Sequence, residues 1–157
     1  MQVVKNCGIW LREDGTAWAD EVCTKQIEPS TDVSGYKYIP DTLLNAAPSS
    51  FLLDISGEQV RGKYLHRMMV FSFGDKNGRP YQSAGIRSII DHVNMNHSDN
   101  RVENLQLVSN GINLFRAYYK TGRPELYERF NTYYESLSDS QKMILECEIK
   151  LDLEGKY

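Results

Sequence analysis

One polar segment near the middle of the chain constrains the fold more than any other. Residues 86–90, Ile-Arg-Ser-Ile-Ile, lead into Asp91 and His92, and apolar residues return from Leu105 onward. Three isoleucines within five residues favour a strand, so residues 86–90 predict a short one that ends at an acid and an imidazole. The polar stretch that follows contains four asparagines, Asn94, Asn96, Asn100 and Asn104.

The N-terminal residues 1–60 predict short strands and turns. Asp14-Gly15, a strong hairpin-turn dipeptide, separates the apolar stretches 9–11 and 16–19. A strand is expected over 36–39, after Ser34-Gly35, and a second hairpin is expected from 51–55 and 60–63 around the turn at 56–58. These elements predict a small antiparallel sheet.

Helical patterns lie before and after the polar segment. Residues 64–73 carry apolar side chains at helical spacing, and Gly74 ends the run. Ser109 or Asn110 is a suitable cap for a helix that runs to about Lys120. Two further helices are expected, one starting at Pro124 and one running from the capping-box residues 138–141 to about 153.

Charge is distributed unevenly along the chain. Residues 61–123 contain ten Lys/Arg and four Asp/Glu, a balance of +6, although the whole chain carries -3. A basic centre between acidic flanks is expected of a protein that meets phosphate on one face. No apolar run approaches the roughly 20 residues that span a bilayer, and the three widely spaced cysteines indicate reduced thiols in the cytoplasm.

Asp91, His92 and Asn113 together suit phosphodiester hydrolysis. That reaction needs an ion to neutralise charge on the phosphate and leaving oxygen, and a base to activate water. Asp91 offers a carboxylate and Asn113 an amide oxygen, which are ligands that Mg²⁺ accepts. His92 titrates near neutral pH and can take the proton of water. The expected ion is Mg²⁺, with Mn²⁺ as the alternative.

The segment from Asp91 to Asn113 resembles the ββα-metal motif of HNH endonucleases, especially phage-type homing endonucleases. The final histidine of the motif is replaced by asparagine, and the resemblance covers roughly residues 60–116. It implies that His92 is the general base, that Asp91 and Asn113 bind the metal, and that Asn104 braces the loop. It also implies double-stranded DNA as the partner, 3′-hydroxyl and 5′-phosphate products, an intron-associated phage gene and a location in the host cytoplasm.

The loop departs from the usual pattern of that family at two places. The sequence His92-Val93-Asn94-Met95-Asn96 stands where members often have His-x-Asp-Gly-Asn, and Asp99 stands where asparagine is more usual. Without glycine, a left-handed turn at Met95 would cost more. Asn96 and Asn100 are interpreted as turn formers. We expect His97 to be exposed or in contact with phosphate, and His66 to be structural.

The predicted fold class is α+β, with three regions. Residues 1–60 form a β-rich, DNA-contacting part, residues 61–120 the nuclease core, and residues 121–157 a helical acidic appendage. The acidic appendage is a poor DNA reader, so it is expected to pack on the core or to mediate self-association. Basic residues expected to contact DNA backbone are Arg87 and Arg116 first, then Arg101, Arg67 and Lys63.

The sequence thus favours a metal-dependent DNA endonuclease or nickase. One alternative is a catalytically weak relative that binds DNA without cutting it, motivated by Asn94 and Met95. Another is a protein-interaction factor whose acidic helices after Pro124 bind a partner.

Overall fold

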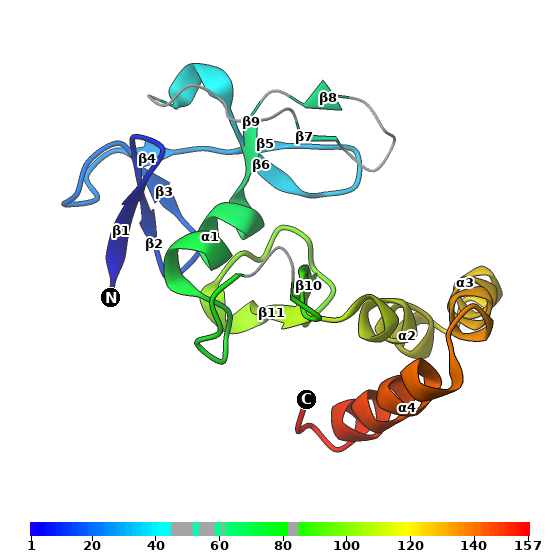
Figure 1. The fold of residues 1–157 in the computed structure, drawn as a ribbon. Coiled ribbons are helices and arrows are strands. Elements are labelled where there is room, and N and C mark those ends of the chain that lie inside the picture. The colour runs from blue at the N-terminus through cyan, green and yellow to red at the C-terminus, as the bar shows by residue number, and fades with distance from the viewer. Residues whose placement is uncertain (45–51, 54–58, 61, 82–84) are drawn as a thin grey trace. The chain divides into compact units, whose positions relative to one another are not determined.

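The computed structural model describes residues 1–44, 52–53, 59–60, 62–81 and 85–157, which form two compact units. Unit 1 comprises residues 1–81 and 90–107, and unit 2 comprises residues 82–89 and 108–157, within these described ranges. These two units are defined by packing contacts, and their boundaries differ from those of the three regions expected from the sequence. The functional roles of the three regions stay predictions. Figure 1 shows the order of the elements along the chain.

Eleven short strands are assigned among the described residues, and where their register is defined they pair antiparallel. The sheets are ordered β1-β2-β3-β4, β5-β6-β9, β7-β8 and β10-β11. The strand bounds are β1 (Val3–Asn6), β2 (Ile9–Arg12), β3 (Ala17–Trp18), β4 (Gln26–Ile27), β5 (Ser30–Thr31), β6 (Lys37–Pro40), β7 (Leu52–Leu53), β8 (Gln59–Val60), β9 (Gly62–Tyr64), β10 (Ile89–His92) and β11 (Leu105–Val108).

The helices are α1 (Leu65–Phe73), α2 (Asn110–Thr121), α3 (Pro124–Glu135) and α4 (Asp139–Leu153), with short 3-10 turns η1 (Asp41–Leu43) and η2 (Val102–Asn104). Their ends are set by local chemistry. Gly74 follows α1 at φ +78, and Gly122 ends α2 in the left-handed conformation. Pro124 opens α3, and Ser138 caps α4 with the expected capping box. All four helices were predicted close to these bounds.

In unit 1, α1 packs its apolar face against strands that precede it in the sequence and against β11, which follows it. Leu65, Met68 and Met69 of α1 are at most 2% exposed. They share one core with inward residues of β2, β3, β6 and β11, namely Ile9, Leu11, Ala17, Ile39, Leu105 and Leu107. Figure 1 shows α1 between the β1–β4 sheet and β11. This core fixes β11 beside the N-terminal sheet.

A buried carboxylate fastens β11 to the turn after α1. Asp75 is 2% exposed, and its Oδ1 accepts hydrogen bonds from the backbone N–H groups of Asn77 and Arg79, each at 2.9 Å. Its Oδ2 accepts from the N–H of Leu107 at 3.0 Å. Asp75 therefore ties the turn after α1 to the backbone of β11.

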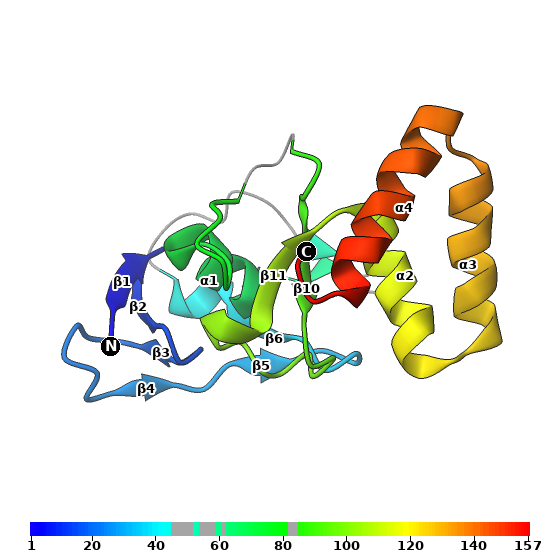
Figure 2. The same ribbon diagram turned by 90° about the horizontal axis from the view of Figure 1, so that it is seen from below.

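In unit 2, α2, α3 and α4 pack side by side, as Figure 2 shows. Their core contains Val108, Ile112, Phe115, Phe130, Leu145 and Tyr157. The contact between α2 and α4 is close at Gly111, where an added Cβ would lie 2.5 Å from a methyl carbon of Leu145. The part of the acidic tail in α3 and α4 thus packs on α2.

The N-terminal hairpins agree with the sequence prediction, and the strand before Asp91 does not. β2 and β3 pair around Gly15, and β7 pairs with β8, while the predicted turn at 56–58 lies outside the described residues. The strand expected over 86–90 instead spans Ile89–His92. Ile86 is 77% exposed, so its apolar side chain does not belong to a buried strand.

Two other expectations concern composition. In the part of the chain that the structure describes, no helix has the length and apolar character to cross a membrane. Cys7, Cys23 and Cys147 are all free thiols.

Replacing Asp75 should destabilise the protein strongly. Asp75→Ala removes the acceptor for three backbone N–H groups, so we expect a loss of about 3 kcal/mol in the free energy of unfolding. Urea denaturation measures it. Asp20→Ala is a matched control, because Asp20 also accepts backbone N–H bonds from Thr24 and Lys25 but at an exposed turn. Equal losses in the two variants would contradict the role given to Asp75.

Candidate active site

His92 ends β10 as a buried imidazole with one defined hydrogen bond. Its side chain is 3% exposed, and its Nε2 lies 2.9 Å from Oδ1 of Asn100. An amide oxygen can only accept, so Nε2 must carry the proton and donate it. In the neutral ring Nδ1 is then the acceptor. In this tautomer Nδ1 is the ring nitrogen that can take a proton from water.

Burial lowers the pKa of His92 below its usual value, and the positive charge that His97 can carry lowers it further. The hydrogen bond to Asn100 and the carboxylates of Asp91 and Asp99 oppose that effect. With the pKa below 6.5, the neutral ring predominates at pH 7.

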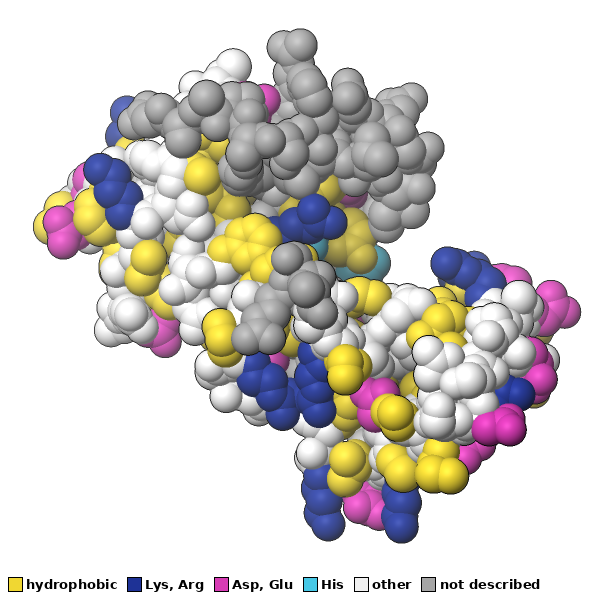
Figure 3. All heavy atoms as spheres, viewed as in Figure 1, with side chains coloured by type: hydrophobic (Ala, Val, Ile, Leu, Met, Phe, Trp, Pro, Cys, Tyr) yellow, Lys and Arg dark blue, Asp and Glu magenta, His cyan; other side chains and the backbone are white. Residues whose placement is uncertain are grey.

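His92 belongs to a cluster of five aromatic rings in unit 1. The ring centroid of His92 is 5.3 Å from that of His66, 5.5 Å from His97 and 5.8 Å from Tyr36. Tyr36 stacks on His97 at 4.1 Å, and Tyr64 lies 5.6 Å from His66. Figure 3 shows that histidine atoms reach the surface on this face. The three histidines, spread over 32 residues of sequence, therefore form one cluster.

His97 holds the loop against the turn between β5 and β6. Its Nδ1 lies 3.0 Å from the carbonyl oxygen of Ser34, and Ser98 Oγ donates to the carbonyl of Gly35 at 2.8 Å. The ring is half-buried on Tyr36, so His97 is a structural link between two segments as well as a neighbour of His92.

His66 is the most deeply affected histidine. It is 8% exposed, and its Nδ1 is buried without a hydrogen-bond partner among the described residues. Burial lowers its pKa to about 3, and nearby positive charge adds to the effect. His66 is therefore neutral throughout the physiological range, which agrees with a structural role.

Asn104 holds the two ends of the polar loop together. Its Oδ1 accepts from the backbone N–H of Asn94 at 3.0 Å, and its Nδ2 donates to the carbonyl of Asp99 at 2.8 Å and to Oδ1 of Asn94 at 2.9 Å. The backbone N–H of Val93 also donates to the carbonyl of Asn104 at 2.9 Å. These are the contacts expected of a loop brace.

The two unusual loop residues, Asn94 and Asp99, are bonded to each other. Asn94 Nδ2 donates to Asp99 Oδ2 at 2.7 Å. The family pattern has a carboxylate at the first position and an amide at the second, whereas this chain has them exchanged. A donor and an acceptor are present in both arrangements. Hydrogen bonds from Arg101 and Asn94 hold the pKa of Asp99 at about 2, so its carboxylate stays charged.

Met95 adopts the left-handed backbone conformation, with φ +64, which costs more for methionine than for glycine. Its N–H donates to the carbonyl of His92 at 2.9 Å, which closes a turn directly after the proposed base. The surrounding hydrogen bonds impose a backbone that favours glycine. Met95 is therefore a strained position beside His92.

The hairpin turn at Gly15 packs directly against the backbone of Asn100. A Cβ on Gly15 would lie 2.6 Å from the carbonyl carbon of Asn100, and Gly15 has φ +83. The N–H of Val102 also donates to the carbonyl of Glu13 at 3.0 Å. The N-terminal sheet thus supports the loop that carries the partner of His92.

Asn100 was interpreted from sequence as a turn former, and that interpretation is wrong. Asn100 is 3% exposed and bonds His92. Asn96 does form a turn, since its Oδ1 accepts from the N–H of Ser98 at 3.0 Å. The only sequence signal that separates them is position: Asn100 lies four residues before the brace Asn104, at the end of the loop.

Asp91 and Asn113 lie in different compact units. Asp91 is half-buried in β10, where its charge helps to raise the pKa of Tyr36, after burial as the main cause. Asn113 is half-buried in the first turn of α2, and its N–H donates to the carbonyl of Ser109 at 2.9 Å. Their oxygen donors suit a hard divalent ion. No group of three or more His, Cys, Asp or Glu that could hold a metal occurs among the described residues.

Of the five basic residues expected to contact DNA, Arg116 is the clearest correction. It is 7% exposed, and its guanidinium bonds both oxygens of Asp152, with Nη2 2.6 Å from Oδ1. A buried, paired arginine holds α2 to α4 and does not present a phosphate contact. Its nearness to the site in sequence did not reveal its acidic partner.

The other four basic residues have different surroundings. Arg87 lies over the ring of Tyr157 at 3.9 Å, and Arg101 bonds Asp99 and Glu103 while its side chain is 51% exposed. Arg67 is exposed beside Tyr64. Lys63 is described only by its backbone in β9. Contact with DNA stays a prediction for these four.

The exchanged pair can be tested by a double-mutant cycle. Asn94→Asp alone places two carboxylates at hydrogen-bond distance, so we expect a loss of about 1–2 kcal/mol in the free energy of unfolding. Adding Asp99→Asn restores a donor and should recover most of that loss. Denaturant titration of both single variants and the double variant measures the coupling. Additive losses would contradict a direct bond between the two side chains.

Burial of His66 makes stability depend on pH. Its folded pKa of about 3 is below the unfolded value of 6.5, so the unfolded chain binds more protons between these values. Stability therefore falls as pH decreases below 6.5, by about 2 kcal/mol from this residue at pH 5. Unfolding curves at several pH values should show a smaller slope for His66→Phe. An unchanged slope would contradict the buried neutral state.

Comparisons with known proteins support the fold. No family model matches this sequence, and no curated protein matches it. A structure solved for DNA binding and cleavage by the HNH homing endonuclease I-HmuI is similar, with a TM-score of 0.52 and 17% sequence identity. The similarity covers 84% of this chain and 67% of that chain. At this identity the likeness concerns the fold alone: the chain has an α+β fold with antiparallel sheets and a helical C-terminus, similar to the fold of that structure.

Proposed function

We propose that this protein is a metal-dependent endonuclease or nickase that hydrolyses phosphodiester bonds in double-stranded DNA. The observation that carries the proposal is the hydrogen bond from His92 Nε2 to Asn100 Oδ1, which leaves Nδ1 of a buried, neutral imidazole as an acceptor. A general base needs a free acceptor and a pKa that keeps it unprotonated at the working pH. The similar fold of an HNH homing endonuclease adds support.

In this proposal His92 accepts the proton of the attacking water at Nδ1. Asn100 holds the ring in the right tautomer, and Asn104 keeps the loop closed so that His92 faces a constant environment. Asp91 and Asn113 hold a divalent ion, Mg²⁺ or Mn²⁺, through oxygen atoms. When bound, that ion would neutralise charge on the phosphate and on the leaving oxygen.

Basic side chains, separate from the two proposed ion ligands, bind the phosphates of the DNA backbone. Arg67 is exposed on α1, one residue from His66, and Arg101 is half-exposed at the end of the polar loop. Both are available for backbone phosphate, since surface ion pairs such as that of Arg101 are weak. Sequence reading falls to the N-terminal sheet, which supports the site through Gly15. The acidic α3 and α4 serve packing or self-association.

The location and origin of the protein follow from this reading as further proposals. A phage homing endonuclease would act in the host cytoplasm and cut near an intron site. Nicking of one strand or cleavage of both is an outcome of the same assay that tests activity.

Incubation with supercoiled plasmid in Mg²⁺ or Mn²⁺ tests the proposal. The wild type should nick the plasmid, His92→Ala should lose about 10²–10⁴-fold in rate, and Asn113→Ala should lose activity that added metal partly restores. Asn96→Ala is the matched control, because it removes an exposed asparagine from the same loop. DNA retention is measured separately in EDTA.

Two results would count against the proposal. Equal nicking by all variants would mean that the cleavage belongs to a contaminant. DNA retention by the wild type without any cleavage in either metal would instead favour a DNA-binding module.

A further inference from the structure

Tyr157 makes two buried or part-buried hydrogen bonds in unit 2. Its ring is 6% exposed, and its hydroxyl accepts a hydrogen bond from the backbone N–H of Ser109 at 3.0 Å. The same hydroxyl donates to Oε2 of Glu148 at 2.9 Å. Burial raises the pKa of Tyr157 above that of an ordinary phenol, so the hydroxyl keeps its proton and remains a donor.

Ser109 connects Tyr157 to the first turn of α2. It is the N-cap residue: its Oγ accepts from the N–H of Ile112 at 3.2 Å, and its carbonyl accepts from the N–H of Asn113 at 2.9 Å. One residue therefore links the tyrosine hydroxyl to the backbone of Asn113 through two successive hydrogen bonds. A shift of Ser109 would move the start of the helix that carries Asn113.

The ring of Tyr157 also contacts the segment that leads into β10. The guanidinium of Arg87 lies 3.9 Å from the ring centroid, and that of Arg116 lies 5.7 Å away. Arg87 precedes Asp91 by four residues, and Ser109 precedes Asn113 by four residues. Tyr157 thus contacts both Arg87 and Ser109 within unit 2.

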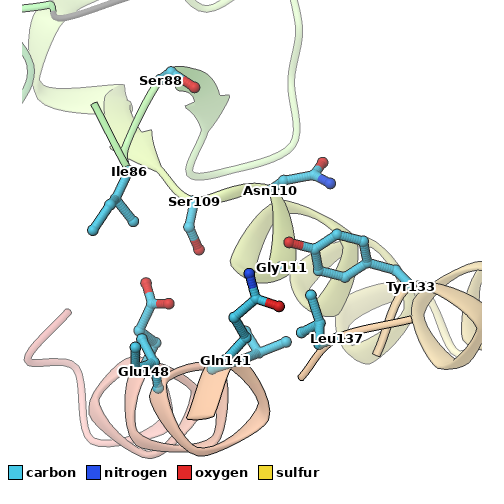
Figure 4. Close-up of a pocket in the computed structure, with 11 residues that line it drawn as sticks. Ile86, Ser88, Ser109, Asn110, Gly111, Tyr133, Leu137, Gln141 and Glu148 are labelled. Atoms are coloured by element: carbon cyan, nitrogen blue, oxygen red, sulfur yellow. The ribbon is translucent and has the colours of Figure 1, made fainter. Parts of the chain in front are cut away.

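The surroundings of Tyr157 hold its hydroxyl in place. Ser109 and Glu148 both line a cavity of about 370 Å³ in unit 2, and Figure 4 shows their side chains directed toward one another, from the residue before α2 and from α4. Gly111 allows the close α2–α4 approach, and Arg116 with Asp152 joins the same helices. The N-terminus of α2 is accordingly clamped from α4.

We infer that Tyr157 is a positioning residue for the proposed metal site: its hydroxyl orients the first turn of α2 and thereby sets the amide oxygen of Asn113 toward the ion. This inference rests on the proposed function. Residues that orient a metal ligand commonly change affinity for the ion by about 10–100-fold when removed. The effect is thus expected in ion affinity more than in the maximal rate.

Tyr157→Phe tests the inference, because phenylalanine keeps the ring against Arg87 and removes only the hydroxyl. We expect about tenfold weaker Mn²⁺ binding, measured by calorimetry or electron paramagnetic resonance without DNA. The Mn²⁺ concentration for half-maximal nicking should rise by a similar factor, with the rate recovering at saturating metal. Amide hydrogen exchange at Asn113 should be faster than in the wild type.

Tyr134→Phe is the matched control. Tyr134 also donates its hydroxyl to a glutamate of α4, Glu146, so its replacement removes the same kind of contact, at an exposed position, without reaching Ser109. This variant should keep wild-type Mn²⁺ affinity and wild-type exchange at Asn113. Urea denaturation of both variants measures any loss of stability separately, and a positioning effect appears as weaker Mn²⁺ binding by folded Tyr157→Phe.

The outcomes separate the inference from the proposed function. A wild type that binds Mn²⁺ and nicks DNA, with Tyr157→Phe identical in ion affinity and in exchange at Asn113, would overturn the inference alone. A folded wild type that neither binds Mn²⁺ nor nicks DNA would overturn the proposed function, and the inference with it.

Discussion

The hydrogen bond between His92 and Asn100 joins the strand that ends at the proposed base to the far end of the polar loop, and much of unit 1 serves to keep it formed. Asn100 can meet His92 only if the loop turns back after Met95, which the three hydrogen bonds of Asn104 enforce. The backbone of Asn100 is held from the other side by the turn at Gly15. The N-terminal sheet therefore contributes to the site although it supplies no proposed catalytic group.

In unit 2, hydrogen bonds hold the backbone of Asn113 in a comparable way. Asn113 is held in the first turn of α2 through Ser109, and Ser109 is held by Tyr157. Buried polar contacts of this kind are costly to break, because each lost partner leaves a desolvated group. In both units a side chain distant in sequence fixes the backbone that carries a proposed functional group. The two ligand segments, near residues 91 and 113, are thus each held by residues outside the motif.

The sequence predicted the helices well because their signals are local. Gly74, Gly122, Pro124 and the capping box at Ser138 each act within a few residues of a helix end. The strand before Asp91 was placed too early because an exposed apolar residue, Ile86, looks the same in sequence as a buried one. Fold class followed from these elements together with the resemblance to the ββα-metal motif.

Asn100 and Arg116 show why the site could be predicted only in part. The residues beside an asparagine in sequence do not tell whether it forms a turn or bonds a buried histidine. The contact of Asn100 with Gly15 spans 85 residues of sequence. Arg116 is paired with Asp152 across two helices. Such long-range partners depend on packing, which local pattern does not specify. In the sequence, Asn94 and Asp99 are two separate departures from the usual loop pattern, and only the structure shows that they bond each other.

The most direct measurement of the central claim is the tautomer of His92. Long-range ¹H–¹⁵N correlation spectra of ¹⁵N-labelled protein at pH 7, assigned by comparison with His92→Ala, report which ring nitrogen carries the proton. We predict a neutral ring protonated at Nε2, and loss of that single tautomer in Asn100→Ala. A neutral ring protonated at Nδ1, or a ring charged at pH 7, would contradict it.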